Sequence, residues 1–398
     1  MKLLHISDLH LGRRLGEFRL YTEQAALLNW VLRTAAEQHA DGILLAGDIY
    51  DRSVPPVEAV TLFDRFLTRL TEMGIPLFAI SGNHDSPERI SFGSRLFDGQ
   101  GIHISQVYDG TVRCVRLDAG GERVYVHLLP FLKPVHVRAA LGMDTADPES
   151  GESEELPDTA DRTMTCTEAM AEVVSRMVLP SDGRNILLCH QFLVGAVRSE
   201  SEEVPLVGTL DAVDASLFSG FDYVALGHLH RAQQVTDTIR YSGTLMPYAF
   251  SETEPKGCIL VDTDGGIHCT FLPVPEGLTR TLATLSGTYD TLISLSFRES
   301  CPHCEDYLKI LLEEDTPVPD AMAKLSVVYP RVVQLSYRHS PAADPTAVYD
   351  PLPDREQLSP EQVFASFYAR QNETALPDAD LDYIRTLLTE EGDALCGR

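Results

Sequence analysis

The sequence predicts a layered α/β fold for most of the chain, followed by a small α+β module and two terminal helices. Short apolar runs rich in Ile, Val and Leu indicate strands that are buried on both faces. These runs occupy residues 3–7, 42–46, 76–81, 124–129, 185–189 and 223–226. Helical patterns separate several of them, and such alternation is typical of a sheet covered by helices.

Two of the intervening stretches have the apolar face of an amphipathic helix. In residues 21–37 this face contains Leu27, Leu28, Val31, Leu32 and Ala35, and in residues 57–73 it contains Val60, Phe63, Phe66, Leu67 and Leu70. We expect both helices to bury these faces. Apolar runs at 239–243 and 257–262 predict two further strands, which close the domain with hairpins.

Changes in composition divide the chain into four parts. We place a layered domain at 1–275, an α+β module at 276–338, a linker at 339–358 and C-terminal helices at 359–398. The prolines at 273–277 mark the first boundary. The linker is rich in Pro, Ala and Asp.

The last two structured parts are predicted from short patterns. In the α+β module we expect strands at 292–297, 307–312 and 332–337 around a helix at 320–328. The C-terminal helices cover 359–370 and 378–391, and the first begins with an N-cap pattern, Ser359 followed by Pro360.

The net charge of −27 argues against a nucleic-acid partner, because DNA-binding proteins usually carry a basic surface. The acidity is uneven, however. It concentrates in the stretch 142–161, which we interpret as a solvated insertion, and in the last fifty residues. The first hundred residues are nearly balanced. The bulk charge therefore lowers the expectation of DNA binding without ruling it out.

The chain shows no feature of a membrane or secreted protein. No apolar run approaches the roughly 18–20 residues that span a bilayer, and the first residues resemble a buried strand rather than a signal peptide. The eight cysteines are expected to be free thiols in the cytoplasm. The pair Cys301 and Cys304 forms a CxxC that lacks a second CxxC to complete a zinc site.

Potential metal ligands follow five of the predicted strands. They are Asp8 and His10, then Asp48, then Asn83, then His190, and finally His228 and His230. Sites in layered α/β proteins assemble at the carboxyl ends of strands. Glycines precede Asp48, Asn83 and His228, where we expect sharp turns. One such residue alone is an ordinary turn or cap, but the whole pattern predicts a metal site.

The kinds of ligand favour two ions of a transition metal. Carboxylate, imidazole and amide oxygen suit Mn, Fe or Zn better than Ca or Mg, and the absence of thiolate argues against a structural zinc site. Seven ligands are too many for one ion and suit two that share a bridging carboxylate. Two ions about 3.5–4 Å apart can activate a water and hold both reacting oxygens of a phosphate.

These residues resemble the calcineurin-like metallophosphoesterase signature in full and in order. The motifs are Asp8-x-His10, Gly47-Asp48, Gly82-Asn83-His84-Asp85, His190 and Gly227-His228-x-His230. The resemblance implies that one ion is held by Asp8, His10, Asp48 and His230. It implies that the other is held by Asp48, Asn83, His190 and His228, with Asp48 bridging.

The same resemblance implies roles for three further residues. His84 would stabilise the charged transition state or protonate the leaving oxygen. Asp85 would orient His84 by a hydrogen bond. Asp51 would order the surrounding loop or support the ligands from outside.

Several segments narrow the resemblance to the SbcD-type nuclease subunits, which are bacterial partners of the SbcC ATPase. They are residues 5–12, 47–52, 81–87, 128–131, 189–192 and 223–230, then 321–325 and 328–330 in a DNA-capping domain, and 359–372 in partner-binding helices. The resemblance implies an endo- and exonuclease for DNA ends and hairpins in DNA repair, recombination and replication, with Mn²⁺ favoured. It also implies a homodimer, for which we expect contacts through residues 57–73.

The chain has features that suit this division of labour. It contains no GxxxxGK[ST] loop, the motif that binds the phosphates of ATP, so we expect a partner protein to hydrolyse ATP. The terminal helices carry the apolar stripes Val363, Phe364, Phe367 and Tyr368, and Leu381, Ile384, Leu387 and Leu388. Two alternatives remain for these stripes. They are buried against a partner protein, or the helices fold back and pack them on the chain's own core.

Four arginines beside the motifs, Arg13, Arg14, Arg52 and Arg89, are candidates for contacts with DNA phosphates. Each could equally be an ordinary solvated arginine. The main alternative function is a calcineurin-like phosphatase or phosphodiesterase with a substrate other than DNA, which would prefer a small phosphate ester. A non-catalytic scaffold is a further alternative, but such proteins usually lose ligands, and here none is missing.

Overall fold

A computed structural model describes residues 1–143, 164–202, 212–314 and 316–338, and a few isolated positions beyond them. The chain divides into two compact units, Met1–Ala283 with Glu305–Tyr307, and Thr284–Cys304 with Leu308–Arg398. The predicted linker, both C-terminal helices and the acidic insertion from residue 144 onward fall almost wholly outside the described residues. No helix among those described is long and apolar enough to cross a membrane.

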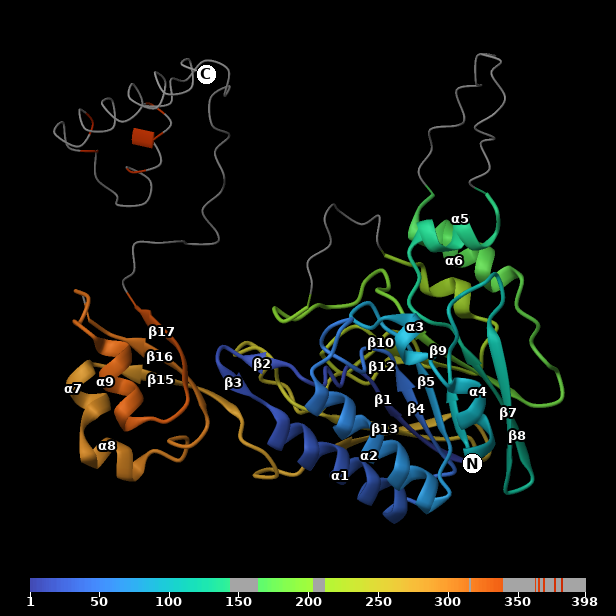
Figure 1. The fold of residues 1–398 in the computed structure, drawn as a ribbon, viewed down its shortest axis with the longest axis horizontal. Helices are drawn as coiled ribbons and strands as arrows, with labels where there is room; N and C mark the ends of the chain where they lie inside the picture. The colour runs from blue at the N-terminus through green and yellow to red at the C-terminus, as the bar shows by residue number, and fades with distance from the viewer. Residues whose placement is uncertain are drawn as a thin grey trace. The chain divides into compact units, whose positions relative to one another are not determined.

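The first unit contains two six-stranded sheets (Figure 1). The first sheet has the order β14 (His268–Pro273), β13 (Gly257–Asp262), β1 (Lys2–Ile6), β4 (Gly42–Ala46), β5 (Leu77–Ile80) and β6 (Ile102–Ile104). Strands β1, β4, β5 and β6 run parallel, so their carboxyl ends share one edge of the sheet. Strand β13 pairs antiparallel with both β1 and β14.

The second sheet is also mixed. Its order is β11 (Gln233–Gln234), β12 (Ile239–Tyr241), β10 (Tyr223–Gly227), β9 (Arg184–His190), β8 (Glu122–Leu128) and β7 (Arg113–Ala119). The central strands β8, β9, β10 and β12 are parallel. The expected closing hairpins exist, but β12 pairs with β11 in this sheet, whereas β13 pairs with β14 in the other.

The two sheets pack face to face around one apolar core. Leu3, Leu44 and Phe78 of the first sheet contact the cluster that includes Val126 and Leu188 of the second. The opposite face of the second sheet is covered by α5 (Pro134–Ala140) and α6 (Cys166–Ser175), whose apolar residues join a second core cluster. A double sheet of this kind holds the ends of β1, β4, β5, β9 and β10 close together.

Helices α1 (Tyr21–Glu37) and α2 (Val57–Met73) have the predicted bounds and lie side by side (Figure 1). The apolar face predicted for α1 is buried. In α2 the prediction is partly wrong, because Val60 is 44% exposed and Leu62 takes a buried position. Short elements complete the unit: β2 (Arg14–Leu15), β3 (Phe18–Arg19), α3 (Pro87–Ile90) and α4 (Ser94–Phe97).

The second unit is built on a three-stranded sheet in the order β15 (Leu282–Gly287), β16 (Tyr307–Leu312) and β17 (Val332–Tyr337), with α9 (Ala321–Val328) as expected. The strand predicted at 292–297 is wrong. Helices α7 (Tyr289–Ile293) and α8 (Leu295–Ser300) lie there instead. The reason is local, because Thr288 and Ser294 accept hydrogen bonds from the backbone N–H groups of Thr291 and Phe297 and act as N-caps.

Candidate metal centre

The seven predicted ligands lie together where the two sheets meet. Asp8 and His10 follow β1, Asp48 follows β4, Asn83 follows β5, His190 is the last residue of β9, and His228 and His230 follow β10. Hydrogen bonds join the loops that carry them, from Asp8 N–H to the Gly47 carbonyl (3.1 Å) and from His10 N–H to the Asp48 carbonyl (3.0 Å). The site therefore rests on strand ends from both sheets.

We expected sharp turns at the three glycines that precede Asp48, Asn83 and His228, but the structure has such a turn at only one of them. Gly47 has a positive φ of 89°, but Gly82 and Gly227 do not. They are needed for space, because a Cβ on Gly82 would lie 2.1 Å from Asp48 Oδ1, and one on Gly227 would lie 1.9 Å from the Ala46 carbonyl oxygen. The sharp turns are made by ligand residues themselves, with positive φ at Asp8 (52°), His10 (42°), Asp48 (49°) and His228 (98°).

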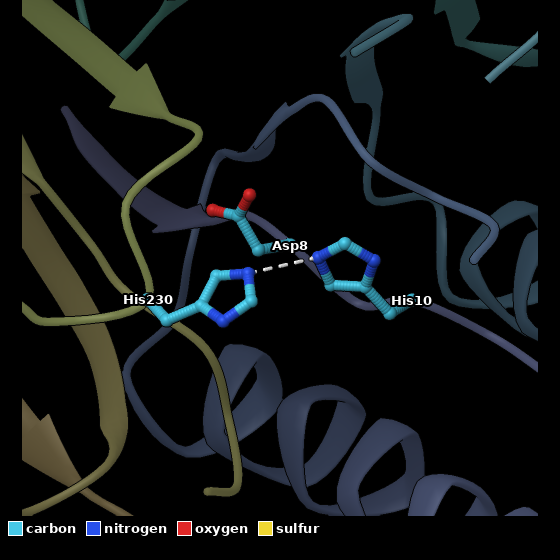
Figure 2. A group of neighbouring side chains, drawn as sticks. All are labelled: Asp8, His10 and His230. Carbon is cyan, nitrogen blue, oxygen red and sulfur yellow. Dashed lines mark hydrogen bonds between the residues drawn. The ribbon is translucent and has the colours of Figure 1, made fainter. Parts of the chain in front are cut away.

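Asp8, His10 and His230 form the first group of converging ligand atoms (Figure 2). The Nε2 atoms of His10 and His230 lie 3.0 Å apart, and a ligand oxygen of Asp8 lies within 4.8 Å of ligand nitrogens on both rings. All three side chains are buried. The hydroxyl of Ser7 donates to the Asp8 carboxylate and also contacts Ser242, which fixes the carboxylate from behind.

The second group surrounds Asn83. Its Oδ1 lies 3.0 Å from His190 Nε2 and 2.9 Å from His228 Nδ1. His190 donates its Nδ1–H to the Ala46 carbonyl (2.8 Å), which leaves Nε2 as the acceptor of the neutral ring. Three acceptors therefore face one another, because Asp48 Oδ2 lies only 3.4 Å from the same Nε2. With a neutral His190 ring, such an arrangement favours a cation between them.

Asp48 connects the two groups. Its Oδ2 lies 3.7 Å from His10 Nε2, 3.4 Å from His190 Nε2 and 4.0 Å from His84 Nε2. Among the described residues, two groups that could hold a metal ion contain Asp48, one with His10 and His84 and the other with Asp8 and His190. One carboxylate thus borders both sets, as a bridging ligand would.

The electrostatics of the site also call for positive charge. Burial would raise the pKa of Asp48, but His190 and His10 hold it far below its usual range. Burial raises the pKa of the Asp8 carboxyl, with Asp48 adding to the effect and His190 opposing it. Burial alone would lower the pKa of His190, yet the Asp48 and Asp8 carboxylates raise it to about 9, so the site favours positive charge beside them. The donor set therefore fits divalent metal.

His84 and Asp85 lie beside this cluster, but their relation differs from the one expected. His84 Nδ1 contacts the carbonyl oxygen of Asp51 at 3.0 Å. The Asp85 carboxylate accepts three backbone N–H groups, from Ile49 (3.0 Å), Tyr50 (2.9 Å) and Gly82 (2.9 Å). Asp85 thus ties the β4 and β5 loops together, and the backbone of Asp51 orients the Nδ1 side of His84.

An open cleft of about 910 Å³ lies over His84 and contains three of the four candidate arginines, Arg13, Arg14 and Arg52. Arg13 is held in place, because its guanidinium donates to Asp51 Oδ1 and to the Ser201 carbonyl (both 3.2 Å). Arg52 is 78% exposed on its side chain. Arg89 is exposed and is not among the residues lining this cleft.

Four further polar residues border His230 and were not anticipated from the sequence: Ser201, Glu202, Glu252 and Lys256. None follows a strand end with a ligand motif. The one available signal was the i,i+4 spacing of Glu252 and Lys256, which pair at 2.5 Å. That spacing is common on ordinary helices and would not have indicated a site.

Two family models match this sequence. Residues 1–232 match the family model described as calcineurin-like phosphoesterase. Residues 278–372 match the SbcD_C model, described as type 5 capsule protein repressor C-terminal domain. The chain is 30% identical over 401 residues to the SbcD subunit of the nuclease SbcCD from Staphylococcus saprophyticus, a match that covers 98% of this chain and 100% of that protein.

Two solved structures have a lower similarity. The protein TT1561 of Thermus thermophilus is 15% identical, with 68% of this chain and 98% of that chain covered and a TM-score of 0.37. A dimetal phosphatase from Danio rerio is 14% identical, with coverages of 66% and 92% and a TM-score of 0.39. The sequence matches therefore carry the assignment. The chain belongs to the SbcD family of metal-dependent nuclease subunits, within the calcineurin-like phosphoesterases.

Proposed function

We propose that the chain cleaves DNA phosphodiester bonds at double-strand ends and hairpins, using two divalent ions of which Mn²⁺ is the favoured one. The convergence of seven strand-end side chains, with Asp48 between the other six, carries this proposal. The name of the relative, the SbcD subunit of a nuclease, supports the substrate class.

The donor set divides naturally between two ions. Asp8, His10, His230 and Asp48 would hold one, and Asp48, Asn83, His190 and His228 would hold the other. When bound, such ions supply Lewis acidity to the phosphate and to the attacking water. The chain itself contributes a rigid frame, because every ligand is fixed at a strand end.

His84 is the residue best placed to act on the substrate. Its Nδ1–H donates to the Asp51 carbonyl, so Nε2 is the ring atom that can carry a proton to the reaction. Its side chain is 19% exposed and lines the open cleft. We infer that it stabilises the charged transition state or protonates the leaving oxygen, and that Asp85 supports it by fixing the loops around it.

The arginines around the cleft would position the duplex by its phosphates. Arg14 and Arg52 are exposed there, and we assign them this role. Arg13 is committed to Asp51 and Ser201, and it would contribute positive potential more than a direct contact. Arg89 would act only if DNA extends beyond the cleft.

The test is cleavage of a labelled DNA hairpin by the purified chain in Mn²⁺, comparing wild type with His84→Ala. We expect a loss of at least about a hundredfold in the variant, equal to a few kcal/mol of transition-state stabilisation, with Mn²⁺ binding retained. If neither protein cuts, the assay is repeated with an SbcC-type partner. Hydrolysis of a small phosphate ester but not of DNA, even then, would favour the generic phosphoesterase.

We also propose that the chain works in the cytoplasm with an SbcC-type coiled-coil ATPase. Residues 276–338 would form the DNA-capping domain, and the helices predicted at 359–398, which lie almost wholly outside the described residues, would bind the partner. The relative's name, which places it within SbcCD, supports such a complex. Removal of residues 359–398 should abolish co-purification with the ATPase while hairpin cleavage in Mn²⁺ persists.

A homodimer through α2 is the remaining proposal. Val57 and Val60 leave apolar surface exposed on this helix, at 78% and 44%. A second copy of the chain would cover it. We expect Val57→Asp combined with Val60→Asp to convert a dimer to a monomer in light scattering, and an unchanged mass would exclude α2 as the interface.

A further inference from the structure

His230 is held by three residues outside the metal-ligand motifs. Its backbone N–H donates to the Glu202 carboxylate at 2.6 Å, and its carbonyl oxygen accepts a hydrogen bond from Lys256 Nζ at 2.8 Å. Its ring Nδ1 lies 2.5 Å from Ser201 Oγ. Both backbone groups and the far side of the ring are therefore fixed.

The directions of these hydrogen bonds follow from the donors present. The hydroxyl of Ser201 donates its single proton to the Glu252 carboxylate, and Lys256 Nζ lies 2.5 Å from the other oxygen of that carboxylate. Ser201 Oγ must then accept from the imidazole, because a hydroxyl has only one proton to give. It follows that Nδ1 of His230 carries the ring proton and Nε2 presents its lone pair. Nε2 is the atom that faces His10 in Figure 2.

The charges behind this chain of hydrogen bonds are buried. The side chains of Glu252 and Lys256 are 1% and 7% exposed. Burying an ion pair costs desolvation free energy, and apolar residues of similar size often stabilise a protein as well or better. Stability alone is therefore a weak reason for such a pair, and a role in orienting Ser201 gives it a specific one.

We propose that Ser201, oriented by the buried Glu252–Lys256 pair, is a positioning residue that holds His230 in the Nδ1–H tautomer and so directs Nε2 at the metal. The relation to a metal rests on the proposed function, whereas the tautomer does not. Hydrogen bonds to the outer nitrogen of metal-binding histidines fix ring orientation and ligand basicity, and their loss typically costs about 10–100-fold in metal affinity or activity.

The direct test is nitrogen NMR of the metal-free, full-length protein with ¹⁵N-labelled histidine. The His230 signals are identified by their absence in His230→Gln. We expect the Nδ1–H tautomer alone in wild type and in Ser201→Thr, which keeps the hydroxyl. In Ser201→Ala we expect the Nε2–H form to appear. A pure Nδ1–H tautomer in Ser201→Ala would overturn the proposal.

A second readout is Mn²⁺ affinity by calorimetry, with unfolding midpoints recorded for each variant. Ser201→Ala should weaken one Mn²⁺ by about 10–100-fold at an unchanged midpoint, and Ser201→Thr should bind as wild type. Equal weakening in both variants would indicate packing rather than the hydroxyl and would overturn the role in metal binding. If wild type binds no Mn²⁺, the two-metal proposal fails, and the NMR result still decides the tautomer.

Discussion

At the scale of single residues, the metal centre combines ordinary side chains with an unusual backbone. Asp8, His10, Asp48 and His228 all have positive φ, a region that costs non-glycine residues about 1–3 kcal/mol each. The hydrogen bonds between the β1 and β4 loops and the isolated bridge between Leu11 and Tyr50 hold the first three there, and the His228 N–H donates to the Asp8 carboxylate. The strained residues follow β1, β4 and β10, and their side chains turn toward a common centre.

Gly82 offers a sharp test of this crowding. A Cβ at this position would lie 2.1 Å from Asp48 Oδ1 and 2.4 Å from the Asp48 backbone nitrogen. We expect Gly82→Ala to displace the Asp48 carboxylate, which we propose as the bridging ligand, and to lower hairpin cleavage by about a hundredfold, the effect of a misplacement near 1 Å. Gly99→Ala is the matched control, because its Cβ would meet nothing within 4 Å. Activity and Mn²⁺ binding equal to wild type in Gly82→Ala would disprove the argument.

The sequence predicted which side chains converge at the candidate metal centre, but not the residues that contact them from outside. Asp8, Asn83 and His228 were identifiable because they follow strands, and the ends of parallel strands meet at one edge. Ser201 and Glu252 lie 51 residues apart, and no local pattern indicates their contact. We expected Asp85 to orient His84 by a hydrogen bond, but His84 Nδ1 contacts the backbone carbonyl of Asp51 instead. A contact with a backbone atom does not depend on the residue type, so the sequence could not indicate it.

At the scale of elements, the prediction succeeded where burial is complete. Strands such as β4 and β10 are buried throughout, so their apolar runs were unambiguous. Strand β7 was not predicted, because no residue in Arg113–Ala119 is fully buried and three charged residues interrupt its apolar ones. The stretch at 292–297 is apolar enough for a strand, but the N-caps Thr288 and Ser294 stabilise helices there instead.

His5 in β1 provides a prediction about the packing of the two sheets. Its ring is buried, with Nδ1 3.0 Å from the Tyr223 hydroxyl and Nε2 3.1 Å from the Leu226 carbonyl. Burial lowers its pKa to about 3, and the hydrogen bond to Leu226 opposes this only in part. The unfolded chain binds a proton near pH 6.5 and the folded one does not, so His5 costs stability as pH falls from about 6.5 toward 3.

His5→Gln should remove this dependence. Between pH 6.5 and 4.5, wild type should lose about 2–3 kcal/mol more of its free energy of unfolding than the variant loses. Urea denaturation at both pH values, in the presence of a chelator, measures the difference. The variant will be less stable at pH 6.5 if glutamine cannot reach both partners, but only the pH-dependent part matters. Equal losses in the two proteins would show that His5 is protonated in the folded state.

At the scale of the whole molecule, the alternation of strands and helices predicted the layered fold, whereas the exact division of the chain was harder to foresee. The two units separate at Ala283 and Thr284, within β15, which begins at Leu282. The prolines near residue 275 follow the end of β14 at Pro273, and the match to the SbcD_C model begins at residue 278, close to the predicted boundary. Composition records where a strand stops, but the limits of a compact unit depend on contacts that the chain makes later.

The distribution of charge over the molecule leads to the last prediction. A chain with net charge −27 can bind DNA only where local positive groups outweigh the repulsion. We expect these groups to be Arg13, Arg14 and Arg52, which line the cleft beside the acids Glu17, Asp51 and Glu202. Binding should therefore weaken steeply with salt, because each neutralised phosphate releases counterions.

Fluorescence anisotropy with a labelled duplex, measured without metal so that no cleavage occurs, tests this surface over a range of salt concentrations. We expect Arg52→Ala to lower the slope of log K against log salt by about 0.9 and to weaken binding equally for different sequences, because it removes one phosphate contact. Arg116→Ala is the matched control, since Arg116 is an exposed arginine paired with Asp118 on β7, away from the cleft residues. If Arg52→Ala and Arg116→Ala both keep the wild-type slope, Arg52 is an ordinary solvated arginine, and the duplex must be held by other groups.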